Sequence, residues 1–395
     1  MIYLDNAATT RPSQQVIDAM MPWLYENYGN PGSLYGIGTD AKRAVKQARE
    51  QVAALINADP GQIIFTSGGS EANSMALRSV LPYLWSNGNF NIAYSNIEHD
   101  SIINCIKWMR QIRDAFDTTI AVSNDGTVSP GSVRVALSDL VYPNDINIGM
   151  VSVMAVNNET GAVNDVKEIS AVCHEHGALF HTDCVQAASS IPLDVKDVGC
   201  DFMSLSSHKL HGPKGIGALY VQDKTLVSPL IFGGAEQEFG LRGGTENVPA
   251  IVGFGKACEL MKQNLGEESK HTSMLKQIFF GHMKQKFEQS GMMDILHLNC
   301  NNLVHPGRIV NFHIDGVDAE TLVLLLSTMG VCVSTGSACR SHEQEPSRVL
   351  LAMGIKQEDA RNSVRVSFSG DNTEKEAKMA AEIFATCVSR LRNGG

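Results

Sequence analysis

The chain has 395 residues, 43% of them hydrophobic and 19% charged, and a formal net charge of −10. This length suffices for one large domain and a smaller one, and the negative charge argues against a membrane surface or direct nucleic-acid binding. The sequence has no apolar run of the about 18 residues that cross a bilayer, and its start, MIYLDNAATT, lacks the basic residues and apolar core of a signal peptide. We therefore expect a cytoplasmic protein without a membrane segment.

The nine cysteines are scattered along the chain, with no C-x-x-C pair and no spacing typical of metal ligands. This pattern is typical of a reducing compartment and mostly buried thiols. The sequence thus predicts reduced cysteines and no metal site.

The first part of the chain predicts two helices separated by a glycine-rich loop. After an extended start, residues 13–28 form the first expected helix and Gly29 to Ser33 form the loop. From Thr39 to Asn57 apolar residues recur at three- and four-residue spacing, which indicates an amphipathic helix with Thr39 as its N-cap.

A strand, a glycine loop and a helix follow directly. Residues 62–65 are typical of a buried strand, residues 66–70 (TSGGS) of a loop, and the helix begins at Glu71. Backbone N–H groups of such a loop at a helix N-terminus suit a phosphate group. The alternative is that the glycines serve only the geometry of the turn.

Strands then alternate with helices, which predicts a mostly parallel sheet covered by helices. The expected strands span residues 91–95, 147–156, 178–183 and 202–206. Four polar residues fall at the carboxyl ends of these strands, where α/β sheets place functional groups: His99, Asn158, Asp183 and Lys209.

Lys209 lies between the strand at 202–206 and another at 216–221, beside the tight turn Gly212-Pro213-Lys214-Gly215. A lysine fixed there can lose solvation, lower its pKa and attack a carbonyl, which is what a Schiff-base cofactor such as pyridoxal phosphate (PLP) needs. The alternative is a surface lysine next to a β-turn.

Three further residues fit the same cofactor. Asp183 can pair with a pyridinium nitrogen, Gln186 can donate to the ring oxygen, and His99 can stack on the ring and shuttle protons. The plainer alternatives are a helix N-cap for the aspartate and an ordinary hydrogen-bonded histidine.

Beyond Glu246 the pattern changes to a long helical tract at 249–290, strands at 308–314 and 363–368, and a closing helix at 374–392. We expect a large domain at 13–250 and a small domain made of 1–12 and 251–395. The run of small polar residues at 334–341, which contains Cys339, is expected to be a mobile loop.

Ten segments, in order along nearly the whole chain, resemble the PLP-dependent cysteine desulfurases of the NifS/IscS-like group, in the class-V aminotransferase family. They are YLDNAATT, GNPGS, FTSGGSEAN, EHD, VNNETG, HTDCVQ, SSHKLHGPKGIGALYV, RGGTEN, STGSACRS and SVRVSFS. The resemblance implies an α/β fold of the fold-type I PLP enzymes. Its large domain would hold a mostly parallel sheet of seven strands, and its smaller domain would be α+β.

The resemblance also implies a role for each matching residue. Lys209 attaches the cofactor covalently, Asp183 and Gln186 hold its ring, and His99 stacks on it and moves protons. Asn158 joins the hydrogen bonds to cofactor and substrate. The cofactor phosphate is gripped by Gly69, Ser70, Ser206 and His208. Thr245 reaches the phosphate in the partner subunit, which implies a homodimer, and Arg365 clamps the substrate carboxylate with Asn30.

Cys339 matches the nucleophile of the family, so the resemblance implies conversion of L-cysteine to L-alanine with a persulfide on Cys339. A sulfur-acceptor protein then receives the sulfur. A free thiol has a pKa of about 8.5, and Arg340 or His342 could supply the positive charge that activates it. The alternative for Cys339 is an inert thiol.

The sequence departs from housekeeping members of the family at Arg340 and His211 and in its short C-terminus. These departures favour a specialised acceptor pathway, such as DNA phosphorothioation or tRNA thiolation, over general iron–sulfur assembly. Two other functions stay open: a selenocysteine lyase or another PLP β-eliminase, and a non-enzymatic protein that relays sulfur.

Overall fold

The computed structural model describes residues 1–88, 91–113, 117–138, 148–301, 303, 306–335 and 346–394. Its largest element is a seven-stranded sheet within those residues, in which β8 alone runs antiparallel to its neighbours. In spatial order the strands are β2 (Ile63–Thr66), β8 (Gly217–Val221), β7 (Phe202–Ser206), β6 (Leu179–Asp183), β5 (Ile148–Ser152), β3 (Asn91–Ser95) and β4 (Asp117–Ile120). The mostly parallel sheet predicted from the sequence is thereby confirmed.

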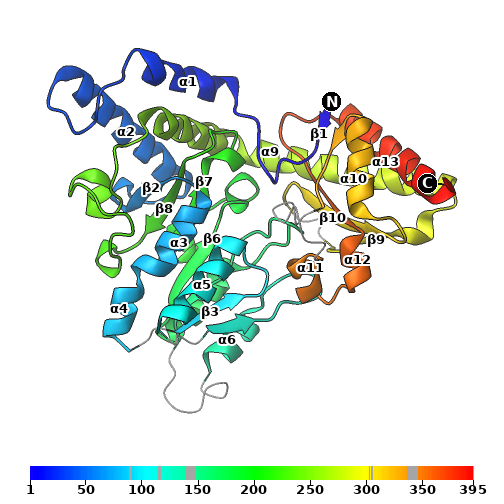
Figure 1. Ribbon diagram of the computed structural model, residues 1–395, viewed down its shortest axis with the longest axis horizontal. Coiled ribbons are helices and arrows are strands. Elements are labelled where there is room, and N and C mark those ends of the chain that lie inside the picture. The colour runs from blue at the N-terminus through cyan, green and yellow to red at the C-terminus, as the bar shows by residue number, and fades with distance from the viewer. Residues whose placement is uncertain are drawn as a thin grey trace.

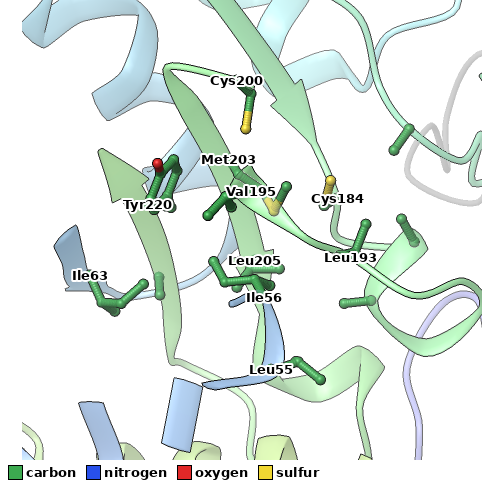
Figure 2. Packing of buried hydrophobic residues seen from close by; sticks show 14 of the residues in the cluster. Leu55, Ile56, Ile63, Cys184, Leu193, Val195, Cys200, Met203, Leu205 and Tyr220 are labelled. Atoms are coloured by element: carbon green, nitrogen blue, oxygen red, sulfur yellow. The ribbon is translucent and has the colours of Figure 1, made fainter. Parts of the chain in front are cut away.

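Helices cover both faces of this sheet, because its strands are apolar on both sides. One face carries α3 (Gly69–Ser79), α4 (Leu81–Ser86) and α5 (Asp100–Arg113). The other carries α1 (Gln14–Tyr25), α2 (Gly36–Leu55), α6 (Pro130–Leu137), α7 (Val166–Glu175), α8 (Val195–Val198) and the first part of α9 (Val248–Gln289). Figure 2 shows part of the apolar cluster on this other face, where Leu205 of β7 lies next to Ile56, the C-cap of α2.

A three-stranded antiparallel sheet forms a second core. Its strands are β12 (Ser363–Ser367), β10 (Ile309–Ile314) and β9 (Leu296–Leu298), with β10 in the middle. The remaining elements of this part are α10 (Ala319–Thr328), α11 (Arg348–Ala352), α12 (Gln357–Arg361), α13 (Glu374–Gly394), and β1 (Ile2–Tyr3) paired with β11 (Val331–Cys332).

Helix α9 joins the two cores (Figure 1). Phe254 and Met261, in its first half, pack against the large sheet, whereas Phe279 and Phe287, in its second half, are buried in the second core. Both ends of the chain lie in the part with the three-stranded sheet, called the small sheet below (Figure 1). The first residues of the chain therefore belong to the part with the three-stranded sheet, and the segment that follows belongs to the part with the seven-stranded sheet.

The structure corrects some predicted boundaries. Helix α2 begins at Gly36 with Tyr35 as its N-cap, so the assignment of Thr39 as the N-cap was wrong. Gly38 lets the chain pack tightly there, since a Cβ on it would lie 2.6 Å from the carbonyl oxygen of Ser33. Strand β5 ends at Ser152, and β4 and α6 were not predicted. The expected loop around Cys339 lies, from Gly336 onward, outside the described residues.

Among the described residues, no helix combines the length and the apolar character that a membrane span requires.

An aromatic cluster holds the second core together, and it provides a test of the fold. The ring of Phe279 lies 5.5 Å from that of Phe384 and 5.9 Å from that of Phe368, between ring centroids. Because Phe279 is fully buried, Phe279→Ala should lower the free energy of unfolding by about 3–5 kcal/mol in urea titrations. Met274→Ala, at a partly exposed position of the same helix, should change it by less than about 0.5 kcal/mol; equal losses in the two variants would contradict the packing.

Candidate active site

The carboxyl ends of β3, β5, β6 and β7 open onto a cavity of about 360 Å³, a size in the range of small-molecule sites. Ten of the residues predicted from the sequence line it: Gly69, Ser70, His99, Asn158, Asp183, Gln186, Ser206, His208, Lys209 and Arg365. Residues from both sheets thus meet at one cavity, and Ala7, Ala8, Asn73, Met154, Val156 and Val185 complete its lining.

Lys209 ends a short 3₁₀ turn, Ser207–Lys209, that follows β7. The turn depends on Gly212, because a Cβ there would lie 2.0 Å from the hydroxyl oxygen of Ser207. The Nζ atom donates hydrogen bonds to the carbonyl oxygens of Ala7 and Ala8, both at 2.6 Å. Burial, together with the nearby charges of Arg308 and Arg365, lowers the pKa of Lys209 to about 7. A large fraction of this amine is therefore neutral and nucleophilic near neutral pH.

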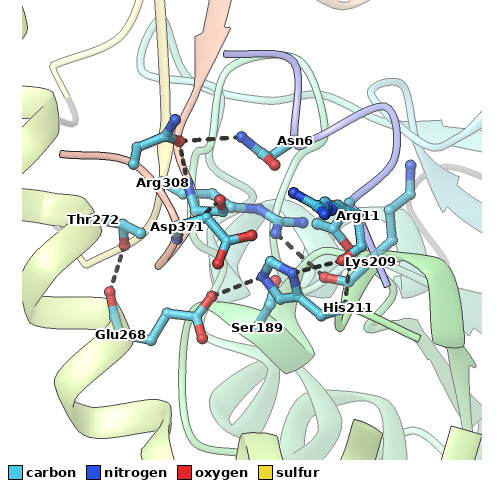
Figure 3. Close-up of polar contacts among 12 residues, drawn as sticks. Asn6, Arg11, Ser189, Lys209, His211, Glu268, Thr272, Arg308 and Asp371 are labelled. Atoms are coloured by element: carbon cyan, nitrogen blue, oxygen red, sulfur yellow. Dashed lines mark hydrogen bonds and ion pairs between the residues drawn. The ribbon is translucent and has the colours of Figure 1, made fainter. Parts of the chain in front are cut away.

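Arg308 contacts the backbone of Lys209 and the side chain of Gln186, a role that no local sequence pattern predicted. The Arg308 side chain is fully buried; it donates from Nη1 to the carbonyl oxygen of Lys209 at 3.2 Å and from Nη2 to Oε1 of Gln186 at 2.9 Å. Gln186 in turn donates from Nε2 to the carbonyl oxygen of Ala7 at 2.8 Å. Figure 3 shows Arg308 between the lysine loop and the N-terminal segment.

His211 lies close to the contacts of Arg308 and Lys209 (Figure 3). It lies 3.0 Å from the carbonyl oxygen of Arg11 through Nδ1 and 3.4 Å from Oε1 of Glu268 through Nε2. The second distance is that of an ion pair rather than of a short hydrogen bond. Burial opposes the charged form, but the contact with Glu268 outweighs it and raises the pKa of His211. The departure from the family pattern at His211 therefore adds an ion pair that links the lysine turn to α9.

A chain of hydrogen bonds orients the aspartate and the histidine of the site. Nδ2 of Asn73 donates to Oδ2 of Asp183 at 2.7 Å and to Oγ of Ser101 at 3.0 Å. The other carboxylate oxygen of Asp183, Oδ1, accepts from the backbone N–H of Val185 at 2.9 Å. Nδ1 of His99 accepts from the backbone N–H of Ser101 at 3.1 Å. Neutral His99 therefore carries its proton on Nε2, which is left to donate.

The N-terminus of α3 is suited to an anion. Its N-cap, Gly68, has no side chain that could satisfy the free N–H groups. A Cβ on Gly69 would lie 2.7 Å from Cγ2 of Val185, so the backbone approaches the cavity where only glycine fits. His208 also lines this cavity. Burial and the charge of Lys209 lower the pKa of His208 to about 4, so it is neutral at pH 7.

Arg365, on β12, brings a buried guanidinium to the cavity from the small sheet. It donates from Nη1 to the carbonyl oxygen of Asn158 at 2.9 Å and from Nη2 to Oδ1 of Asp5 at 2.8 Å. Its Nε has no hydrogen-bond partner among the described residues. The guanidinium is therefore fixed in position at the cavity, where its positive charge suits a carboxylate.

Two predicted site residues that the structure describes lie away from the others. Asn30 and Thr245 do not line the cavity in the described structure, and Oδ1 of Asn30 accepts a hydrogen bond from the backbone N–H of Gly32 at 2.9 Å. Cys339 lies outside the described residues.

The family model for class-V aminotransferases matches residues 2–379. The chain belongs to the class-V aminotransferase family. A relative named cysteine desulfurase IscS, from Clostridium botulinum, is 38% identical over 395 residues, which cover 99% of this chain and 95% of the relative. Two similar solved structures are a NifS-like protein (TM-score 0.86, 29% identity, 98% of this chain and 99% of that one) and SspA in complex with cysteine (0.76, 30%, 93% and 99%).

This chain has the fold-type I architecture, and PLP is the cofactor of the class-V aminotransferase family. The described residues fit that group. The cavity offers a nucleophilic amine, an oriented carboxylate and a glycine-lined helix N-terminus, and the buried Oδ1 of Asn73 has no hydrogen-bond partner among the described residues. When bound, PLP supplies an electron sink for negative charge that develops on a substrate carbon.

The lowered pKa of Lys209 predicts how the protein without cofactor captures PLP. Only the neutral amine attacks the aldehyde, so the rate of capture should rise as pH increases through about 7. Stopped-flow absorbance after mixing PLP with cofactor-free protein, from pH 5.5 to 10, measures this rate. A rate that rises only near the ordinary lysine pKa of about 10.4 would contradict the burial of the amine.

Proposed function

We propose that this protein is a PLP-dependent cysteine desulfurase that converts L-cysteine to L-alanine and transfers the sulfur through Cys339 to an acceptor protein. The observation that carries the proposal is the cavity in which Lys209, Asp183 and His99 meet, in a chain that is 38% identical to a cysteine desulfurase over its full length.

In this proposal each residue has one task. Asp183 and Gln186 hold the cofactor ring, and Gly69, Ser70, Ser206 and His208 hold its phosphate. The buried guanidinium of Arg365 binds the substrate carboxylate, with Asn158 and Asn30. Nζ of Lys209 accepts the proton from the substrate Cα, because its pKa of about 7 leaves a large fraction of the amine neutral near pH 7. Nε2–H of His99 donates toward the cofactor or the substrate.

The sulfur step requires a nucleophilic thiolate at Cys339. Its Sγ forms a bond to the substrate sulfur while the Cβ–S bond of the substrate breaks. The electron pair of that bond takes up a proton on the carbon that becomes the methyl group of L-alanine. The sulfur remains on Cys339 as a persulfide, so the step needs no external oxidant. Transfer to an acceptor protein regenerates the thiol.

The same proposal includes the acceptor pathway and the organisation of the chain. The substitutions at His211 and Arg340 favour a dedicated acceptor, as in DNA phosphorothioation or tRNA thiolation, over general iron–sulfur assembly. We assign residues 13–250 to the PLP-binding domain and residues 1–12 and 251–395 to the small domain, with the boundary at the start of α9, whose first half packs against the large sheet and joins the two domains. We place the protein in the cytoplasm.

The desulfurase function is tested by measuring sulfide and alanine released from L-cysteine, with a reductant present, in the wild type and Cys339→Ser. We expect yellow protein in both cases and a loss of about 10³-fold or more in the variant, because removal of a covalent nucleophile eliminates the sulfur step. Cys387→Ser, at a buried position on α13, is the matched control. Full activity of Cys339→Ser would instead indicate a β-eliminase or a selenocysteine lyase.

A homodimer that shares its sites is the second part of the proposal, because Thr245 lies away from the cavity of its own chain. Large apolar side chains are exposed on and after α1 and on the loop that precedes Thr245. They are Met21, Leu24, Tyr25, Tyr28, Leu34, Tyr35, Ile231 and Phe232. Exposed apolar surface of this kind marks protein interfaces, and Leu34 and Phe232 are 99% and 85% exposed.

Sedimentation of the PLP-loaded protein tests the dimer. The wild type should sediment at twice the chain mass. Phe232→Asp should shift it toward the monomer by weakening association at least about tenfold, since a buried charge is costly at an interface. Leu324→Asp, at an exposed position on α10, should leave the dimer intact. A monomeric wild type, or a dimer unaffected by Phe232→Asp, would contradict this interface.

A further inference from the structure

Two histidines and an aspartate come together on the small sheet, away from the active site. His297 on β9 is the direct cross-strand partner of His313 on β10. Asp315 follows two residues after His313, and its backbone N–H bonds to the carbonyl oxygen of Ile295 at 2.9 Å, so the strand pairing continues to it. Residues two apart on a strand share a face with the residue opposite. All three side chains therefore lie on one face, and none of them lines the active-site cavity.

The distances within this cluster are those of metal ligands. Nε2 of His297 lies 3.1 Å from Oδ2 of Asp315, and Nε2 of His313 lies 3.7 Å from Oδ1. One ligand atom from each of the three residues lies within 4.8 Å of the others. In a tetrahedral site with metal–nitrogen bonds of 2.0–2.1 Å, ligand atoms are about 3.4 Å apart. Small side-chain movements would bring all three atoms onto one ion.

A buried network fixes which nitrogen of His313 is free to bind. Its Nδ1 lies 2.5 Å from Oδ1 of Asn299. The amide Nδ2 of Asn299 is used elsewhere, since it donates to Oδ1 of Asn311 at 2.6 Å and to Oγ of Ser363 at 2.8 Å. The oxygen of Asn299 is thus the atom that faces His313, and Nδ1–H donates to it. In neutral imidazole this leaves the lone pair on Nε2, which faces Asp315.

This arrangement matches the way proteins orient metal-binding histidines, in which the second ring nitrogen donates to an oxygen. Two imidazoles and one carboxylate are the ligands of zinc and related ions, whereas magnesium and calcium prefer oxygen alone. We propose that His297, His313 and Asp315 form a binding site for one divalent cation of the zinc class, with the remaining position open to water.

The ion would stabilise the pairing of β9 with β10. The Asn299–Asn311 network next to this cluster reaches the loop that carries Asn158 of the active site, because Nδ2 of Asn311 donates to the carbonyl oxygen of Glu159 at 3.0 Å. Spacing along the sequence gives no sign of this site, because strand pairing alone brings His297 beside His313.

Zinc titration of the full-length, PLP-loaded protein tests the proposal, with Cys339→Ser as the parent so that this thiol does not compete. Calorimetry should give one zinc ion per chain, and the zinc K-edge X-ray absorption spectrum should show nitrogen and oxygen ligands without sulfur. His297→Gln and Asp315→Asn should each weaken binding by at least about tenfold. Zinc should raise the Tm of the parent but not of these variants.

His282→Gln is the matched control, since His282 also contacts a carboxylate, Glu382, at 3.2 Å, but is not part of the three-residue cluster. It should bind zinc as the parent does. The proposal is wrong if the parent takes up no zinc, if sulfur ligands dominate the spectrum, or if His297→Gln and Asp315→Asn bind as tightly as the parent. Equal loss in His282→Gln would also overturn it, because binding would then be adventitious.

Discussion

The amine of Lys209, buried against the carbonyl oxygens of Ala7 and Ala8, is the contact on which the site depends. It joins the end of β7 to an N-terminal segment that begins beside the small sheet. Burial lowers the pKa of the lysine, while the two carbonyls hold Nζ in place. The same contact thus closes one wall of the cavity and prepares a nucleophile, and folding and chemistry depend on one arrangement.

Polar links, together with a small buried apolar cluster that includes Met154 and Leu350, connect the two parts of the molecule around the cavity. Arg365 on β12 reaches the carbonyl oxygen of Asn158, and Arg308 reaches that of Lys209. A guanidinium can make several hydrogen bonds in a fixed geometry, so each arginine positions a loop as well as a charge. The small sheet therefore completes the active site, and whatever stabilises that sheet also stabilises the position of Arg365.

Hydrogen bonds between the ends of neighbouring strands orient the side chains that line the cavity. Asn73 binds both the carboxylate of Asp183 and the hydroxyl of Ser101, which in turn lies 2.8 Å from His99. Asn73 and Asp183 are buried, and between buried groups such links hold side chains in single orientations. The proton donor and the carboxylate are thereby placed relative to each other before any ligand binds.

The sequence by itself determined the glycine loop before α3 and the positions of His99, Asp183 and Lys209 at strand ends. Hydrophobic periodicity and turn residues are local signals, and a parallel sheet gathers its carboxyl ends at one edge. Only the tertiary structure decided the partners of these residues: Asn73 for the aspartate, Arg308 for the lysine loop, and the cluster of two histidines and an aspartate on the small sheet. These contacts join residues far apart in the chain, and their geometry exists only once strands have paired and side chains are buried.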